Sequence, residues 1–152
     1  MKKPSIALSA ENIRFTNYLD GLFHMASSCS TWIGPSYIET LCMDQKNYAE
    51  FFSGHFRVPM ELLENVLTNE SLKDALTAWL GENEPKIVDG LIHWMQSGLG
   101  KATGIFRLTH CEKLTAALSQ YNQGRGRFYF MEDILFIAFP KKMVCLMMGN
   151  DE

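Results

Sequence analysis

Apolar residues recur every three or four positions through the first two-thirds of the chain, which is the spacing of amphipathic helices. A capping pattern at 9–12 predicts a first helix that fades near 27–28, and an irregular stretch follows through Trp32 and Pro35. Asp44 is the predicted cap of a second helix, which carries Tyr48 and His55. Further helices are predicted at about 60–68, from Asn69 or Ser71 to about 80, at about 85–97 and at about 111–121, where the same spacing continues between glycine and proline positions.

The pattern changes after residue 124 to short apolar runs with β-prone residues. The runs "RFYFME", "ILFIAFP" and "MVCLMM" are separated at 132–133 and 140–142, and such short polar gaps are typical of tight hairpins. We therefore predict an α+β fold, a single globular domain over 1–152, whose helical N-terminal two-thirds packs on a C-terminal three-stranded antiparallel meander. Residues 104–108 offer a fourth strand. Much of the apolar surface of the sheet is expected from Phe128, Phe130, Leu135, Ile137, Val144 and Leu146.

Composition supports one compact domain with a sizeable core, because 47% of the 152 residues are apolar. No run of apolar residues is long enough to predict a membrane span. The apolar run near Met1 is also too short for a signal-peptide core, so we expect a cytoplasmic location.

Acidic residues are concentrated in the middle of the chain. The segment 58–100 holds seven acids and two lysines, a balance of −5, although the whole chain has a net charge of only −3. This acidity either serves solubility or forms a negative face for a basic partner. On the second interpretation the partner-binding residues are drawn from Glu61, Glu64, Glu70, Asp74, Glu82, Glu84 and Asp89, with Glu132 and Asp133 at a hairpin tip as a second pool.

The stretch "GRGRFYFMED" at 124–133 combines arginines, glycines and aromatic residues, as a loop that grips nucleic acid would. The signature of a four-stranded RNA-binding sheet is nevertheless missing. Arg127 stands where its first aromatic residue belongs, Tyr129 stands where its small residue belongs, and the acids at 132–133 would repel a phosphate. The stretch is better explained as a strand, and we expect no direct binding of nucleic acid.

Candidate catalytic chemistry is weak, so we expect no enzyme activity, no metal and no cofactor. The four cysteines contain no CxxC pair and are expected to be reduced, and no zinc-ligand spacing joins them to a histidine. A Cys–His nucleophile assembled from distant residues stays open. The glycines at 98–104 lack the order of a phosphate-binding loop. The cysteines are Cys29, Cys42, Cys111 and Cys145.

Nine methionines and three tryptophans complete the apolar inventory. The scattered methionines favour core filling over an adaptable binding surface. Trp32, Trp79 and Trp94 are expected to anchor the helical layer, but a single exposed tryptophan would mark a strong point of protein–protein contact.

The ending "GRFYFMEDILFIAFPKKMVCLMMGNDE" resembles that of immunity proteins from bacterial contact-dependent growth-inhibition systems. The resemblance covers about the last 30 residues and consists of an aromatic hairpin, an apolar last strand and a polar tail. It implies a small cytoplasmic binding protein that neutralises one cognate toxin domain, often a basic nuclease, in a tight one-to-one complex. Two other classes stay open: a dimeric secretion chaperone or adaptor protein, and an enzyme with a Cys/His site.

Overall fold

The computed structural model describes residues 8–27, 37–56, 63–65, 71–80, 85–108, 112–124 and 130–150. Within these ranges the chain forms five helices and five strands. The helices are α1 (Ala10–Ser27), α2 (Tyr48–Phe56), α3 (Ser71–Leu80), α4 (Pro85–Leu99) and α5 (Glu112–Gly124). The strands are β1 (Tyr37–Asp44), β2 (Leu63–Asn65), β3 (Gly104–Leu108), β4 (Phe130–Ala138) and β5 (Lys142–Asn150).

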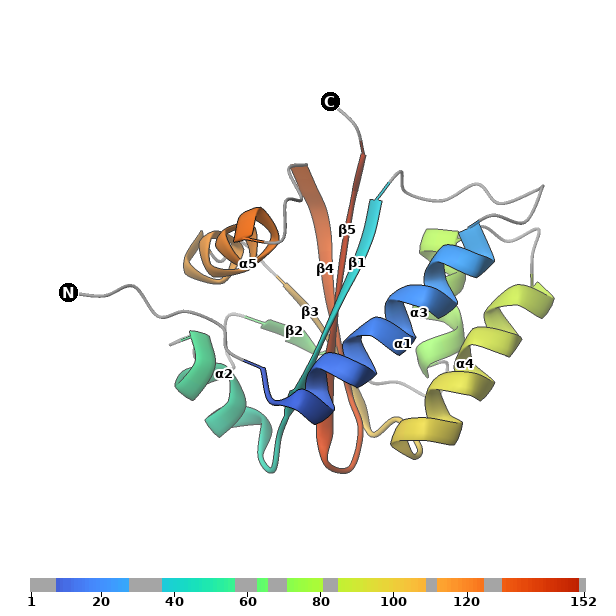
Figure 1. The fold of residues 1–152 in the computed structure, drawn as a ribbon, viewed down its shortest axis with the longest axis horizontal. Coiled ribbons are helices and arrows are strands. Elements are labelled where there is room, and N and C mark those ends of the chain that lie inside the picture. The colour runs from blue at the N-terminus through green and yellow to red at the C-terminus, as the bar shows by residue number, and fades with distance from the viewer. Residues whose placement is uncertain are drawn as a thin grey trace.

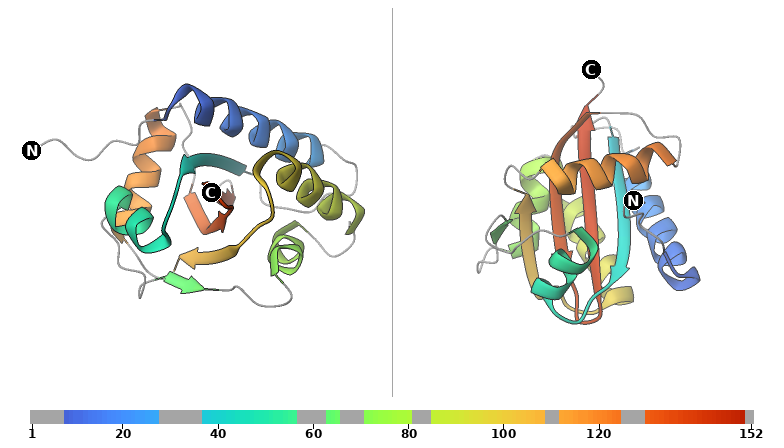
Figure 2. Two further views of the ribbon diagram at one scale, coloured as in Figure 1. Left: turned by 90° about the horizontal axis from the view of Figure 1, so that it is seen from below. Right: turned by 90° about the vertical axis from the view of Figure 1, so that its left-hand side faces the viewer.

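All five strands form one sheet in the order β1-β5-β4-β3-β2, and every neighbouring pair is antiparallel. Helices α1, α3 and α4 lie on one side of the sheet, and α2 and α5 lie on the other (Figure 1). The perpendicular views in Figure 2 show the same two groups of helices with the sheet between them. The fold is therefore α+β, as predicted, with helices covering both faces of an antiparallel sheet.

Burial on both faces explains why the last two strands have almost uninterrupted apolar sequences. Successive side chains of a strand point to opposite faces, so a strand covered on both sides must be apolar at nearly every position. In β4, Leu135 and Ile137 join the core cluster under α1, α3 and α4, whereas Ile134 and Phe136 join the cluster under α2 and α5. Phe136 lies at the centre of the second cluster.

Four predicted helices are confirmed closely and a fifth in outline. The start of α1 has the expected cap, because the backbone N–H of Asn12 donates to the Ser9 hydroxyl at 3.2 Å. The cap of α2 differs from the prediction: the Asn47 side chain accepts from the N–H of Glu50 at 3.2 Å, and Asp44 is instead the last residue of β1. The helices α3 and α4 begin as predicted, and α5 begins and ends within a few residues of the predicted bounds.

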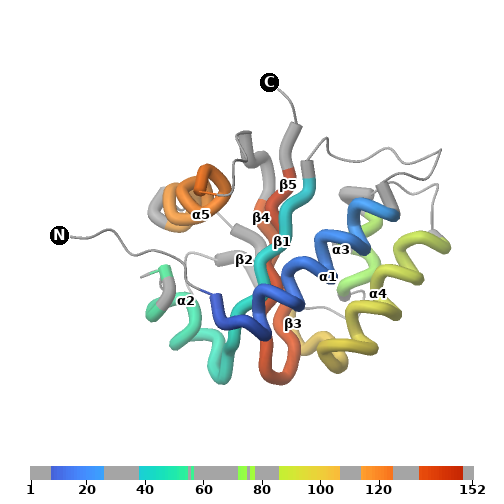
Figure 3. Tube along the Cα trace, viewed as in Figure 1, coloured from blue at the N-terminus to red at the C-terminus, as the bar shows by residue number. Residues whose placement is uncertain are grey.

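The structure differs from the sequence prediction in three of its strands or strand groups. The helix predicted at 60–68 is wrong, since 63–65 form the edge strand β2, paired with β3. The strand β1 was not predicted at all. The three-stranded meander is wrong in detail, because two of its predicted strands are parts of the single strand β4, and β1, β3 and β2 extend the sheet around the β4–β5 hairpin. The predicted strand at 104–108 is present as β3. The trace in Figure 3 shows β1 beside β5, although the two are far apart in the chain.

Candidate functional site

The acidic residues predicted to bind a partner occupy several different elements. Asp74 is exposed in the first turn of α3, and Asp89 is exposed on α4, where its carboxylate lies 2.9 Å from the Lys73 ammonium group. This ion pair links α3 to α4 and partly neutralises Asp89. Glu64 belongs to β2, opposite Arg107 of β3. Of the remaining predicted residues of the middle segment, none is within the described ranges: Glu61, Glu70, Glu82 and Glu84.

Glu132 and Asp133 do not form a hairpin tip, which corrects the prediction for this second acidic pool. Both lie inside β4, where the register shifts between Met131 and Asp133, so Glu132 is the extra residue of a β-bulge. A bulge leaves one residue of the strand unpaired and increases the local twist. In the sequence, polar residues at a bulge interrupt an apolar run just as the residues of a turn do. The turn itself lies at 139–141, between the ends of β4 and β5.

The two described thiols are unsuited to nucleophilic chemistry at neutral pH. Cys42 and Cys145 are buried and unbridged. Burial raises the pKa of Cys42 to about 12, the Asp44 and Glu11 carboxylates adding to the effect and Lys142 opposing it, and burial also raises the pKa of Cys145 well above its usual value. A protonated, enclosed thiol is a poor nucleophile. Cys29 and Cys111 lie outside the described ranges, and among the residues inside them no three His, Cys, Asp or Glu side chains are grouped to hold a metal.

The high thiol pKa predicts a loss of stability at alkaline pH. The unfolded Cys42 thiol has a pKa of 9.0 and the folded one about 12, so the folded state holds the proton more tightly. The resulting stabilisation is complete below pH 9 and is lost as pH rises toward the folded pKa. Between pH 8 and pH 10, ionisation of Cys42 in the unfolded state should lower the free energy of unfolding by about 1 kcal/mol. Urea denaturation at both pH values measures this decrease in the free energy of unfolding. The Cys42→Val variant should show a smaller decrease, and an equal decrease would contradict the raised pKa of Cys42.

Three polar side chains on one face of α1, here called the polar stripe, cover the outer edge of β1. Asn12, Thr16 and Asp20 are four residues apart and therefore share one face of the helix. The N–H of Thr40 donates to Asp20 Oδ1 at 3.0 Å, and the N–H of Cys42 donates to Thr16 Oγ1 at 2.9 Å. An edge strand with unpaired backbone groups invites pairing with another chain. The α1 side chains satisfy two of these groups. The spacing of the three polar residues was a sequence signal for this role, and it was missed.

Lys142 joins the same stripe at the start of β5. Its ammonium group donates to Asn12 Oδ1 at 2.8 Å and to Asp44 Oδ1 at 2.5 Å, and lies 3.5 Å from Glu11 Oε2. Burial by itself lowers the pKa of Lys142, but the hydrogen bond and charge of Asp44, with the charge of Glu11, outweigh it and raise the pKa above its usual value. Lys142 therefore stays charged and links α1, β1 and β5. It is not a neutral amine that could act as a base or nucleophile.

An open groove of about 450 Å³ lies between the start of α1 and the end of α4. The two helices run antiparallel, and the last turn of α4 lies beside the first turns of α1 (Figure 1). The groove is lined by Glu11, Arg14, Phe15, Tyr18 and Gly98. Large apolar side chains are exposed on the same pair of helices: Tyr18 is 42% exposed, Met25 is 71% exposed and Trp94 is 53% exposed. Trp94 is therefore exposed and not the buried anchor that was expected, and an exposed tryptophan marks a possible contact with another protein. The side chains of Trp32 and Trp79 lie outside the described ones.

A second hollow of about 290 Å³ is more polar. It is lined in part by Gln45, Lys46, Tyr48 and Thr103, and the Tyr48 and Thr103 hydroxyls lie 2.7 Å apart. Gln45 donates to the carbonyl of Phe139 at 2.6 Å, and its own side-chain oxygen has no hydrogen-bond partner within the described ranges. None of the exposed large apolar side chains of the described residues lines this hollow. The α1–α4 groove is therefore the better candidate for protein contact.

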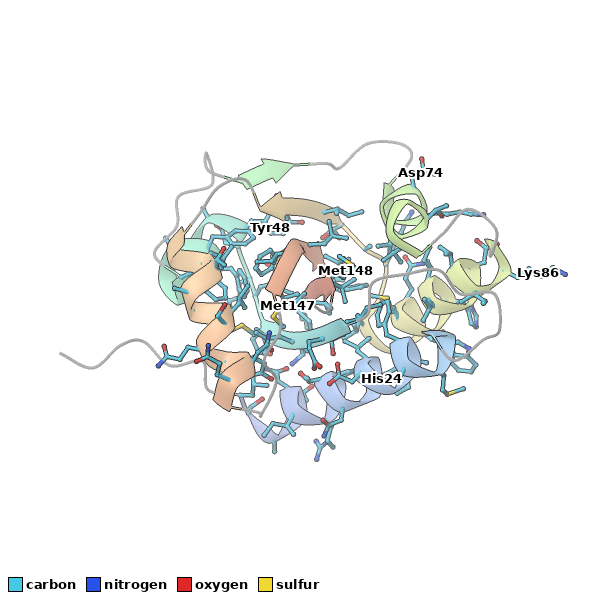
Figure 4. The ribbon with its side chains drawn as sticks, turned by 90° about the horizontal axis from the view of Figure 1, so that it is seen from above. His24, Tyr48, Asp74, Lys86, Met147 and Met148 are labelled. Atoms are coloured by element: carbon cyan, nitrogen blue, oxygen red, sulfur yellow. The ribbon has the colours of Figure 1, made fainter. Side chains whose placement is uncertain are left out.

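The methionines divide between core and surface. Met43, Met95, Met143, Met147 and Met148 are buried, which agrees with core filling. The buried set includes the two methionines that are labelled in Figure 4, Met147 and Met148. Met25 is the exposed exception among the methionines whose side chains are described, and it lies on α1.

Comparison of the chain with protein-family models, with curated proteins and with solved structures gave no match. None of the helices in the described part of the chain is both long and apolar enough to cross a membrane.

Proposed function

We propose that this protein is a binding protein that neutralises a cognate toxin domain, of the basic nuclease type, by forming a tight one-to-one complex. The observation that carries the proposal is the exposure of Trp94, together with Tyr18 and Met25, on the neighbouring helices α1 and α4. Tryptophan and tyrosine are enriched among the residues that dominate protein–protein binding energies. Their exposure is costly in an isolated domain, and burial in a complex removes that cost.

The acidic middle segment supports the same proposal through electrostatics. Opposite charges on two partners accelerate their encounter, and like charges exclude wrong partners. Asp74 is exposed on α3 and available to such a field, whereas Asp89 shares its charge with Lys73. We propose that a few acidic residues, drawn from the segment 58–100 and from the pair Glu132 and Asp133, accelerate the encounter with a basic toxin.

The proposal is tested by titrating the activity of the natural partner. The partner is isolated by native co-purification, identified by mass spectrometry and produced separately. Its cleavage of DNA and RNA is then measured against rising amounts of this protein. We expect activity to fall linearly and to vanish at a one-to-one molar ratio. Undiminished activity of a folded partner would contradict the proposal, and a partner held in a non-native form by a dimer would indicate a secretion chaperone or adaptor instead.

Charge reversal of Asp74 tests the electrostatic part separately. The Asp74→Lys variant should associate with the partner several-fold more slowly at low salt, and the difference should shrink at high salt because ions screen exposed charges. Glu50→Lys is a matched control, since Glu50 is likewise an exposed first-turn acid but lies on α2, on the opposite face of the sheet. Stopped-flow fluorescence measures the rates. Equal rates for both variants would show that the acidity of this segment serves only solubility.

A further inference from the structure

The exposed Trp94 of α4 lies between two glycines on the same face of the helix. Gly90, Trp94 and Gly98 are spaced four residues apart and therefore lie along one face of the helix. A Cβ atom added at Gly90 would meet nothing within 4 Å, and one added at Gly98 would meet only the Phe15 ring, at 3.8 Å. Both glycines thus leave open space beside the indole. We call these two glycine positions recesses, because each lacks a side chain beside the exposed indole. Such an alternation of large and small positions is suited to packing against the side chains of another helix.

The facing side of α1 supplies the second wall. Phe15 is half-buried at the floor of the groove, and Tyr18 lies on its rim. Met25 follows Tyr18 by seven residues, so it lies two turns further along the same side of α1. Because α1 and α4 are antiparallel, Tyr18 and Met25 follow α1 toward the start of α4 (Figure 1). The exposed apolar surface is therefore elongated along the seam between the two helices.

A basic residue lies at each end of this seam. Arg14 lines the groove at one end, and no described residue forms a hydrogen bond or an ion pair with its guanidinium group. Lys86 lies at the other end, in the first turn of α4, with its side chain extended away from the fold (Figure 4). The acid in the groove lining, Glu11, faces the Lys142 ammonium group at 3.5 Å. Twelve residues of α4 separate Lys86 from Gly98, a span of about 18 Å at the helical rise.

We infer that the α1–α4 groove docks one amphipathic helix of a partner protein, with an apolar ridge along its centre and carboxylates near both ends. The ridge fills the recesses beside Trp94, and the carboxylates meet Arg14 and Lys86. A groove between two helices suits a helix, whose side chains pack along one face, whereas a peptide that adds as a strand needs a free sheet edge. A second copy of this chain would present the same two cations, so its charges do not complement the groove. The inference goes beyond toxin neutralisation, because it states which kind of segment of the partner is bound and makes no statement about the activity of the partner.

The test uses two labelled peptides of about 16 residues as probes. Both carry leucines at the spacing of a helical ridge; one has glutamates near its ends and the other has lysines at the same positions. Fluorescence anisotropy measures their binding to the full chain. We expect the acidic peptide to bind at least about tenfold more tightly than the basic one. The Arg14→Glu variant should reduce or reverse this preference.

A variant that fills the recess at Gly90 distinguishes specific docking of a helix from nonspecific hydrophobic binding. Gly90→Gln places a side chain in open space within a helix, so the fold should persist while the affinity for the acidic peptide falls about tenfold or more. Gly54→Gln is the matched control, because Gly54 is also a helical glycine with nothing within 4 Å, and it lies on α2 across the sheet. Trp94→Ala should weaken binding by a similar factor.

Three results would overturn the inference. They are no measurable binding of the acidic peptide, equal binding of the two peptides, and an affinity unchanged by Gly90→Gln. A concentration-dependent dimer that Gly90→Gln abolishes would also overturn it, because the occupant would then be a second copy. These outcomes do not depend on the toxin titration, so either proposal can fail while the other stands.

Discussion

Replacing Phe136 with alanine is expected to lower the free energy of unfolding by about 3–5 kcal/mol. The Phe136 ring is fully buried in β4 and makes edge-on contacts with three rings of α2. Its ring centroid lies 6.1 Å from that of Phe51, 5.0 Å from that of Phe52 and 6.0 Å from that of Phe56. Truncation removes the transfer free energy of the ring and leaves a cavity that this close-packed cluster cannot fill.

Chemical denaturation of the wild type and the variant measures this loss, with Phe136→Leu as the control. Leucine keeps much of the apolar volume, so it should cost clearly less than alanine. Helix α2 contributes most of the neighbouring rings, and its amide protons should therefore lose the most protection from hydrogen exchange. A loss below about 1 kcal/mol would mean that Phe136 is exposed and that α2 does not cover this face of the sheet.

Replacing Asp20 with alanine is expected to cost about 2 kcal/mol and to promote self-association. Asp20 Oδ1 accepts from the N–H of Thr40 at 3.0 Å and lies 2.6 Å from the Thr40 hydroxyl. Hydrogen bonds to a charged acceptor contribute more than neutral ones, and the abandoned N–H would lie at a sheet edge. With its side-chain cover removed, the outer edge of β1 becomes a template for pairing with a second molecule.

The control for this prediction is Asn17→Ala, which removes a polar side chain from the exposed face of the same helix. That variant should change the free energy of unfolding by less than about 0.5 kcal/mol and remain as monomeric as the wild type. Light scattering at increasing protein concentration measures the association. If Asp20→Ala and Asn17→Ala behave alike, then the polar stripe of α1 does not protect the β1 edge.

The sequence predicted the helices well because their apolar spacing and caps are local signals. Strand β1 was not predicted because polar residues are buried on both of its faces, which obscures the apolar pattern. Glu39 and Thr40 are both buried, and only the fold shows that Thr40 finds its partners on α1. The false helix at 60–68 had good helical spacing, but pairing of 63–65 with β3 determines its structure. Local propensity is a weak guide where contacts distant in sequence decide.

The surface was harder to predict than the fold. The acidic residues could be counted, but Asp89 proved to share its charge with Lys73 of another helix. The bulge at Glu132 resembled a turn because polar residues interrupt an apolar run in both cases. The α1–α4 groove combines residues that are far apart in the chain, such as Tyr18 and Gly98. No periodicity distinguishes an exposed tryptophan, such as Trp94, from a buried one.

The position of β5 makes folding depend on residues far apart in the chain. Strand β5 is hydrogen-bonded to β4 on one side and to β1 on the other, with Tyr37 opposite Gly149 and Asp44 opposite Lys142. Until β5 is present, β1 has no neighbour in the sheet and β4 lacks one of its two. Contacts between such distant residues slow folding. In a nascent chain that stops before 142, β1 would therefore have no neighbouring strand and the apolar strand β4 would have one open edge, so we expect such a chain to need protection from aggregation during synthesis.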